Sequence, residues 1–244
     1  MKIKSPFFNR SNLRDIIIIV AAISAMINHI DDTKIVIALF LLAFGCFLNF
    51  VTKGVLIRNI TVCKDGIYSI VRHPYYTANY LIDSCFCLLS GNVYLVWIYP
   101  VLFFLTYGTT IRNEEKYLTS TNGNQYYEYM ANTPQVFPDK TSTRLWKTLF
   151  RGFSLQRITL NETSRMLRFW AVALFIILLR NIELRSIIKF HVSFDHSYFS
   201  SLFDDPNRLL LVLLIFTIYT ISVFIKPRNN KKPIGSGALT DKSI

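Results

Sequence analysis

A chain of 244 residues in which 52% are hydrophobic has the composition of a membrane protein. The formal net charge of +12 would suggest a nucleic-acid partner in a soluble protein, but here the basic residues lie between apolar runs. We therefore expect an anionic lipid bilayer as a partner, and no nucleic acid. The four cysteines form no CxxC pair and no zinc-type cluster with histidine, so we predict no metal site.

Six apolar segments predict an all-α integral membrane protein, built as a bundle of about six transmembrane helices, because one span needs roughly 20 mainly apolar residues. The longest apolar region, 80–111, is interrupted by Ser90-Gly91-Asn92, which is typical of a turn, so we interpret it as a helical hairpin. The other segments are 16–30, 35–51, 166–182 and 209–225. Segment 166–182 is short, and its alternative is a helix lying partly in the membrane interface.

Basic residues indicate the topology. With a cytoplasmic N-terminus and six helices, the outer loops contain few Lys and Arg, which are Lys34, Arg180, Arg185, Lys189 and Arg208. The inner segments contain most of the others, in 1–14, 53–72, 112–168 and 226–242. This bias predicts a multi-pass protein with both termini in the cytoplasm.

We divide the chain into four parts. Residues 1–140 form the expected membrane core and contain two polar motif blocks, 66–80 and 112–138. Residues 141–165 form a basic cytoplasmic connection, either an amphipathic interfacial helix or a disordered loop. Two additional transmembrane helices follow in 166–226, and 227–244 form a flexible cytoplasmic tail.

The first block reads GIYSIVRHPYYTANY and places Arg72, His73 and Pro74 at the mouth of a membrane helix. Pro74 suits the first turn of that helix and disfavours a helical His73. The free N–H groups of the helix then point to the same place as His73, which favours an anionic or polar ligand group. The alternative is an ordinary interfacial belt of tyrosine and arginine.

The second block, RNEEKYLTSTNGNQYYEYMANTPQVFP, follows the fourth predicted span directly. Glu114 and Glu115 lie at most one turn from lipid, where a carboxylate is costly unless it is paired or hydrated. They could face Arg72 or Arg112, or bind a cationic ligand; a solvated helix end is the alternative. Asp83, inside the third span, could face a substrate cavity or pair within the bundle.

The patterns GxYxxVRHPxY, over 66–76, and RxEExxLxxxxGxxYxxY, over 112–129, together resemble the isoprenylcysteine carboxyl methyltransferase and phospholipid methyltransferase superfamily. The resemblance covers roughly 66–138. Two positions depart from the family pattern, Ala78 for a glycine and Asn122 for an aromatic residue. The two predicted spans after Arg165 look like an addition to the family core.

The resemblance implies an S-adenosylmethionine-dependent membrane enzyme with a lipid-linked or hydrophobic methyl acceptor. A glutamate would bind the cofactor ammonium, tyrosines would face its sulfonium or adenine, and Arg72 would bind its carboxylate. Arg112 would orient a substrate carboxylate. The implied catalytic residues are Arg112 and Glu115, and the implied cofactor-binding residues are Arg72, His73, Pro74, Tyr76, Glu114, Glu115, Tyr126 and Tyr129.

The best-matched acceptor is the carboxylate of a C-terminal isoprenylcysteine. A phospholipid amine, or a small hydrophobic thiol or acid, is the nearest alternative. Two other classes of function stay open: an NADPH-dependent membrane sterol reductase, and a non-catalytic membrane scaffold whose polar clusters are interface anchors.

Overall fold

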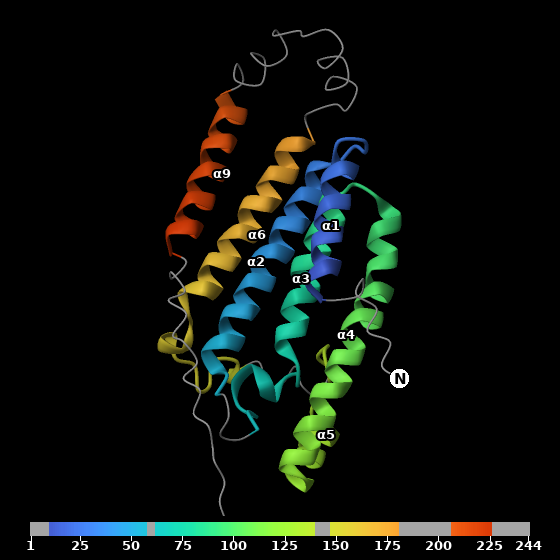
Figure 1. Ribbon diagram of the computed structural model, residues 1–244, viewed down its shortest axis with the longest axis vertical. Coiled ribbons are helices and arrows are strands. Elements are labelled where there is room, and N and C mark those ends of the chain that lie inside the picture. Colours follow the sequence, from blue (N-terminus) through green and yellow to red (C-terminus); the bar gives the residue numbers. More distant parts are fainter. Residues whose placement is uncertain (1–9, 58–61, 140–146, 181–205, 226–244) are drawn as a thin grey trace, which may run out of the picture.

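The computed structural model describes residues 10–57, 62–139, 147–180 and 206–225 (Figure 1). Within these residues the chain is entirely helical, which confirms the expected all-α class. Seven α-helices are present there: α1 (Arg10–Ala25), α2 (Asp32–Val55), α3 (Pro74–Leu89), α4 (Val93–Asn122), α5 (Asn124–Asn132), α6 (Leu160–Leu179) and α9 (Pro206–Ile225). Two short 3-10 helices, Gly66–Ser69 and Leu155–Arg157, lie in the connections.

Three of the helices, α2, α4 and α9, are long and apolar enough to cross a membrane. In Figure 1, α1, α2, α3 and α6 run alongside one another, with α9 beside α6 and α4 at the opposite edge. The expected six spans are not confirmed, because α1 and α3 have only 16 residues each and the first three turns of α6 contain charged side chains. The number of spans and the cytoplasmic termini stay predictions.

The predicted hairpin is present between α3 and α4. The turn lies at Ser90-Gly91-Asn92, where Gly91 has φ +67°, a left-handed conformation that favours glycine. The Asn92 side chain caps α4 by accepting a hydrogen bond of 2.9 Å from the Tyr94 N–H. The hairpin brings both motif blocks to the same end of the molecule, because one block precedes α3 and the other begins in the last turns of α4.

Helices α2 and α3 approach closely at Gly45. A Cβ atom there would lie 3.0 Å from the Ala78 carbonyl oxygen and 2.8 Å from Ile82 Cγ1. Ala78, which stands where the family has glycine, is fully buried at this crossing. The absence of a side chain at Gly45 therefore permits the close approach of α2 to the backbone of α3.

A buried ion pair joins four helices. The Asp83 carboxylate, on α3, lies 2.5 Å from Nε of Arg14 on α1 and has no exposed surface. Arg14 also donates to Asn79 Oδ1, and its guanidinium lies 4.8 Å from the ring centroid of Phe169 on α6. The Tyr99 hydroxyl, on α4, donates to the second carboxylate oxygen at 3.2 Å. Of the two interpretations of Asp83, the structure shows pairing within the bundle.

The connection before α6, for which an amphipathic helix and a disordered loop were the two alternatives, is described only in part and stays a prediction. Its described part, 147–159, contains 3-10 helix at 147–148 and at Leu155–Arg157 and no α-helix, while 141–146 lie outside the described residues. Helix α6 begins at Leu160, after a capping box in which Thr159 and Glu162 exchange hydrogen bonds. The predicted outer loop, 181–205, and the tail, 227–244, also lie outside the described residues.

The Arg14–Asp83 pair predicts a specific double-mutant result. Replacing either residue alone by leucine leaves a buried charge without its partner, which should lower the free energy of unfolding by about 3–5 kcal/mol. The double variant should lose much less than the sum, because both charges are then absent. Unfolding of the four proteins in mixed micelles measures this, and simple additivity of the two single losses would contradict it.

Candidate active site

Backbone hydrogen bonds hold the two motif blocks together. The chain turns at Gly66, whose φ of +58° favours glycine, and then passes through a short 3-10 helix to Arg72. The Arg72 N–H donates to the Pro134 carbonyl at 2.8 Å, and the His73 N–H donates to the Gln135 carbonyl at 2.9 Å. These two hydrogen bonds join residues that are more than 60 positions apart in the chain.

Helix α3 begins at Pro74, as predicted, with His73 as its N-cap residue. His73 has φ −123°, a non-helical conformation consistent with the restriction that proline places on the residue before it. The Thr77 hydroxyl, in the first turn, donates to the Val136 carbonyl of the second block. The helix N-terminus and His73 therefore face the second block, and both lie at the end of the bundle where α4 continues into α5 (Figure 1).

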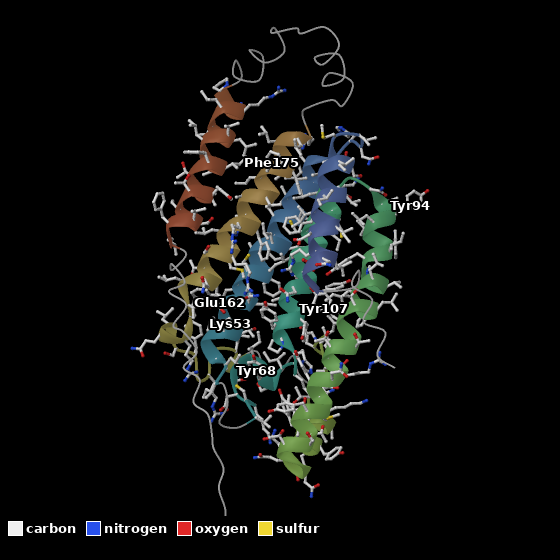
Figure 2. The ribbon with its side chains drawn as sticks, in the orientation of Figure 1. Lys53, Tyr68, Tyr94, Tyr107, Glu162 and Phe175 are labelled. Carbon is white, nitrogen blue, oxygen red and sulfur yellow. The ribbon has the colours of Figure 1, made fainter. Side chains whose placement is uncertain are left out.

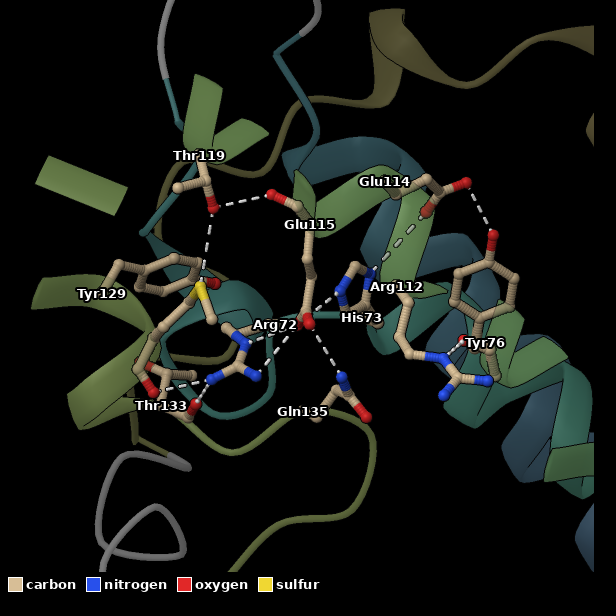
Figure 3. Close-up of polar contacts among 12 residues, drawn as sticks. Arg72, His73, Tyr76, Arg112, Glu114, Glu115, Thr119, Tyr129, Thr133 and Gln135 are labelled. Carbon is tan, nitrogen blue, oxygen red and sulfur yellow. Dashed lines mark hydrogen bonds and ion pairs between the residues drawn. The ribbon is translucent and has the colours of Figure 1, made fainter. Parts of the chain in front are cut away.

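The Glu115 carboxylate is the centre of the polar contacts in Figure 3. Its Oε1 accepts from Arg72 Nε at 3.0 Å and lies 2.9 Å from Arg72 Nη2. The same oxygen lies 3.2 Å from His73 Nε2, and Oε2 accepts from Gln135 Nε2 at 2.9 Å. Because the Glu115 side chain is only 11% exposed, this carboxylate is matched by an arginine and two further polar partners largely away from water.

Arg72 has further partners on the second block. Its Nη1 donates to the carbonyls of Met130 and Thr133, each at 2.7 Å. The guanidinium therefore binds Glu115 on α4 and two carbonyls at the end of α5 (Figure 3). These contacts show Arg72 joining helices, while its predicted binding of the cofactor carboxylate stays a prediction.

Glu114 faces a different neighbour from Glu115. The Tyr76 hydroxyl donates to Glu114 Oε1 at 2.7 Å, and His73 Nδ1 lies 3.8 Å from Oε2. The Glu114 side chain is 43% exposed, four times the fraction of Glu115. Of the two adjacent carboxylates, Glu114 is therefore the more accessible to solvent or a ligand, whereas Glu115 is largely buried by its protein partners.

The predicted site residues divide between two pockets. A pocket of about 440 Å³ lies between the ends of α2 and α4 and the start of α3; the predicted residues that line it are Arg72, His73, Pro74, Tyr76 and Glu114. A second pocket of about 560 Å³, between α4 and α5, is lined by Arg112 and Glu115. Arg112 is thus not brought to the pocket that contains Glu114, and its Nε donates to the Gly108 carbonyl at 3.2 Å.

Tyr126 and Tyr129 on α5 are buried and line neither of these pockets. Their rings pack edge to face with centroids 5.9 Å apart, and the Tyr129 hydroxyl donates to the Tyr68 carbonyl at 2.6 Å. Gly123, with φ +54°, makes the turn that places α5 against the first block. Burial raises the pKa of the Tyr126 phenol to about 12, with a further contribution from the nearby Glu115 charge.

Several residues of the site were not identified from the sequence. Gln135 completes the Glu115 contacts, and Lys53, Tyr68 and Tyr75 line the pocket of about 440 Å³. Gln135 lies within the second block, so its position in the motif was an available signal. Lys53 precedes both blocks at the end of an apolar helix, and nothing local distinguishes it from an ordinary interfacial lysine.

The fold and site define a helical protein with a polar pocket at the end of its apolar bundle. Residues 33–120 match the isoprenylcysteine carboxyl methyltransferase (ICMT) family. Cobalt-zinc-cadmium resistance protein CzcN of Cupriavidus metallidurans is 30% identical over 108 residues, 44% of this chain and 46% of that protein. Protein-S-isoprenylcysteine O-methyltransferase of Schizosaccharomyces pombe is 28% identical over 127 residues, 47% of this chain and 54% of the relative. No solved structure gives a significant match.

These matches confirm the resemblance to the ICMT-like superfamily that the motif blocks predict. Together with the three apolar helices, they identify an integral membrane protein. The chain spans about half the length of the curated relatives it matches. The family match contains all of block 66–80 but ends at residue 120, within α4, so α5, α6 and α9 lie beyond it.

The burial of Tyr126 predicts a stability loss at high pH. Because its folded-state pKa is raised, the neutral phenol stabilises the fold below the ordinary value of about 10, and this contribution is lost as the pH rises towards 12. Tyr126→Phe should remove this part of the decline. Unfolding followed across that pH range measures it, and identical pH dependence in the two proteins would contradict it.

Proposed function

We propose that this protein is an S-adenosylmethionine-dependent membrane methyltransferase acting on a lipid-linked acceptor, with the carboxylate of a C-terminal isoprenylcysteine as the preferred acceptor. The observation that supports this most is the pocket of about 440 Å³ in which the matched block meets Glu114 at the end of the apolar bundle. A water-soluble cation and a lipid-borne group can meet at such a place. A volume of this size is in the range of small-molecule sites.

The residues of this pocket fit the cofactor, which supplies a methyl group on a positively charged sulfur. Glu114, exposed and held by Tyr76, would bind the ammonium of the cofactor. The Tyr76 ring packs edge to face against Tyr107, with centroids 5.5 Å apart, and offers an aromatic surface to a cation. His73 and the N-terminus of α3 would bind polar and anionic edges of the same molecule.

Glu115 has a separate role in this proposal. Its contacts with Arg72, His73 and Gln135 orient the imidazole beneath the pocket and hold α4 against the first block. Glu115 and Arg72 would then act by positioning His73 and Glu114. Arg112 lines the neighbouring pocket, so its proposed contact with a substrate carboxylate requires an acceptor that approaches along the α4–α5 side.

The chemistry requires little of the protein beyond orientation and exclusion of water. A carboxylate acceptor already has the electron pair that forms the new oxygen–carbon bond, and no proton must leave. An amine acceptor must lose a proton, for which His73, 3.2 Å from the Glu115 carboxylate, or Glu114 in the same pocket would be the general base.

Glu114→Gln tests the cofactor site. Removing this charge should weaken binding of S-adenosylmethionine roughly tenfold or more, because a charge-assisted hydrogen bond is lost. Glu128→Gln, an exposed carboxylate on α5, is the matched control and should bind normally. Calorimetric titration of the purified proteins gives both affinities. Equal binding by wild type and Glu114→Gln would exclude this role, and no binding by folded wild type would favour the reductase or scaffold interpretation.

The stability of the methylated product to base separates the acceptor classes. We expect a prenylated cysteine substrate to receive a labelled methyl group that mild base releases as methanol, because esters hydrolyse and methylated amines or thioethers do not. Incubation of the protein with labelled cofactor and either prenylcysteine or phosphatidylethanolamine measures this. A base-stable label on the phospholipid, with none on the prenylcysteine, would replace the carboxylate proposal with an amine.

A further inference from the structure

A second polar cluster lies beside the candidate active site, between α2, α3 and α6. Lys53 Nζ lies 4.9 Å from the Tyr75 ring centroid, and the Arg165 guanidinium carbon lies 5.7 Å from the same centroid. Lys53 Nζ also lies 3.3 Å from Glu162 Oε1, and Figure 2 shows these two residues at the same level of the bundle. We refer to Lys53, Tyr75, Glu162 and Arg165 as the Lys53–Arg165 cluster.

This cluster has an excess of positive charge. An adjoining cavity of about 550 Å³ is lined by Lys53, Arg157 and Glu162. Within the described residues, Glu162 is the carboxylate that pairs with Lys53, and no carboxylate there pairs with Arg157 or Arg165. The two cations on the cavity wall, against one carboxylate, therefore favour an anion.

Three donor atoms on α2 and α6 are buried and have no hydrogen-bond partner within the part of the chain that the structure describes. Nε and Nη2 of Arg165 are buried without a hydrogen-bond partner among the described residues. Asn49 lies one turn before Lys53 on α2 and is only 1% exposed, and its Nδ2 is likewise buried without a partner among those residues. A buried donor left unpaired is costly, so such groups call for an explanation. Since all three atoms are donors, the group that would satisfy them is an acceptor.

The position of the cluster indicates what carries that acceptor. Lys53 and Leu56 line both the cavity of about 550 Å³ and the pocket that contains Glu114. Lys53 lies in the last turn of α2, one of the three helices apolar enough to span a membrane, which places it where lipid head groups lie. Arg157, Glu162 and Arg165 all lie beyond the segment that matches the family.

We infer that the Lys53–Arg165 cluster binds the acidic head group of an amphiphile, either a carboxylate or a phosphate, whose apolar chain lies along the bundle. Lys53 and Arg165 bind the oxyanion, Asn49 donates to it, and Glu162 limits its affinity by competing for Lys53. This site adjoins the proposed cofactor pocket and shares Lys53 and Tyr75 with its wall, but it does not include Glu114. It rests on the proposed function only where the amphiphile is taken to be the methyl acceptor.

Binding without cofactor tests the inference. The full chain in phosphatidylcholine nanodiscs is titrated with oleate, phosphatidate, uncharged oleyl alcohol or inorganic phosphate, and bound molecules are counted by native mass spectrometry. We expect oleate or phosphatidate to bind at least about tenfold more tightly than oleyl alcohol and phosphate, the better of the two acids identifying the head group. Lys53→Gln and Arg165→Gln should each remove most of that preference, whereas Arg168→Gln, one turn along α6, should not.

A variant that binds more tightly than wild type tests the site independently of misfolding, because a misfolded protein would lose affinity. Glu162→Gln removes the competing charge and retains a side chain suited to the capping box, so it should bind the acidic amphiphile several-fold more tightly. Equal binding of oleyl alcohol and the acids would refute an anion site in the cluster. Unchanged affinity for the acids in Lys53→Gln, Arg165→Gln and Glu162→Gln would refute it too. If inorganic phosphate binds as tightly as the acidic amphiphiles, the apolar chain contributes nothing, and the ligand is not an amphiphile. Absence of S-adenosylmethionine binding by wild type would refute the proposed function, but it would not affect a measured binding of the acidic amphiphile at the Lys53–Arg165 cluster.

Discussion

The contact between Glu115 and Arg72 holds the candidate active site together. Arg72 bonds to this carboxylate on α4 and to two carbonyls at the end of α5, so one guanidinium joins segments from both motif blocks. The contact is largely removed from water, where an unpaired partner is strongly destabilising. The position of His73, and with it the N-terminus of α3, depends on this pair because the imidazole bonds to the same carboxylate oxygen.

Two adjacent glutamates have different environments because they lie on different faces of one helix. Successive residues of a helix point about 100° apart, so enclosing Glu115 against the first block turns Glu114 towards the pocket. Enclosure suits a residue that positions others, whereas the 43% exposure of Glu114 suits a ligand contact. Helix α6 adds Arg165 beside the Tyr75 ring and Glu162 beside Lys53, and both residues come from the part of the chain beyond the family match.

Much of the fold followed from local pattern. The turn at Ser90-Gly91-Asn92, the start of α3 at Pro74 and the meeting of the two motif blocks were predicted, because turn residues, proline and apolar length act over a few residues. Helix α6 begins at Leu160, before the apolar segment 166–182, because its first turns are polar and a capping box marks its start. Tyr126 and Tyr129 are buried, and the Tyr129 hydroxyl donates to the Tyr68 carbonyl; their contact with a cofactor stays a prediction.

The sequence by itself determined the membrane class, the all-helical fold and the superfamily resemblance, because hydrophobic length and motif spacing are properties of consecutive residues. Only the tertiary structure decided which residues share a pocket. It separated Arg112 from Glu114, paired Asp83 with Arg14, and brought Lys53 beside Arg165, more than 100 positions later. Such pairings depend on how helices pack and rotate against one another, which no local pattern specifies.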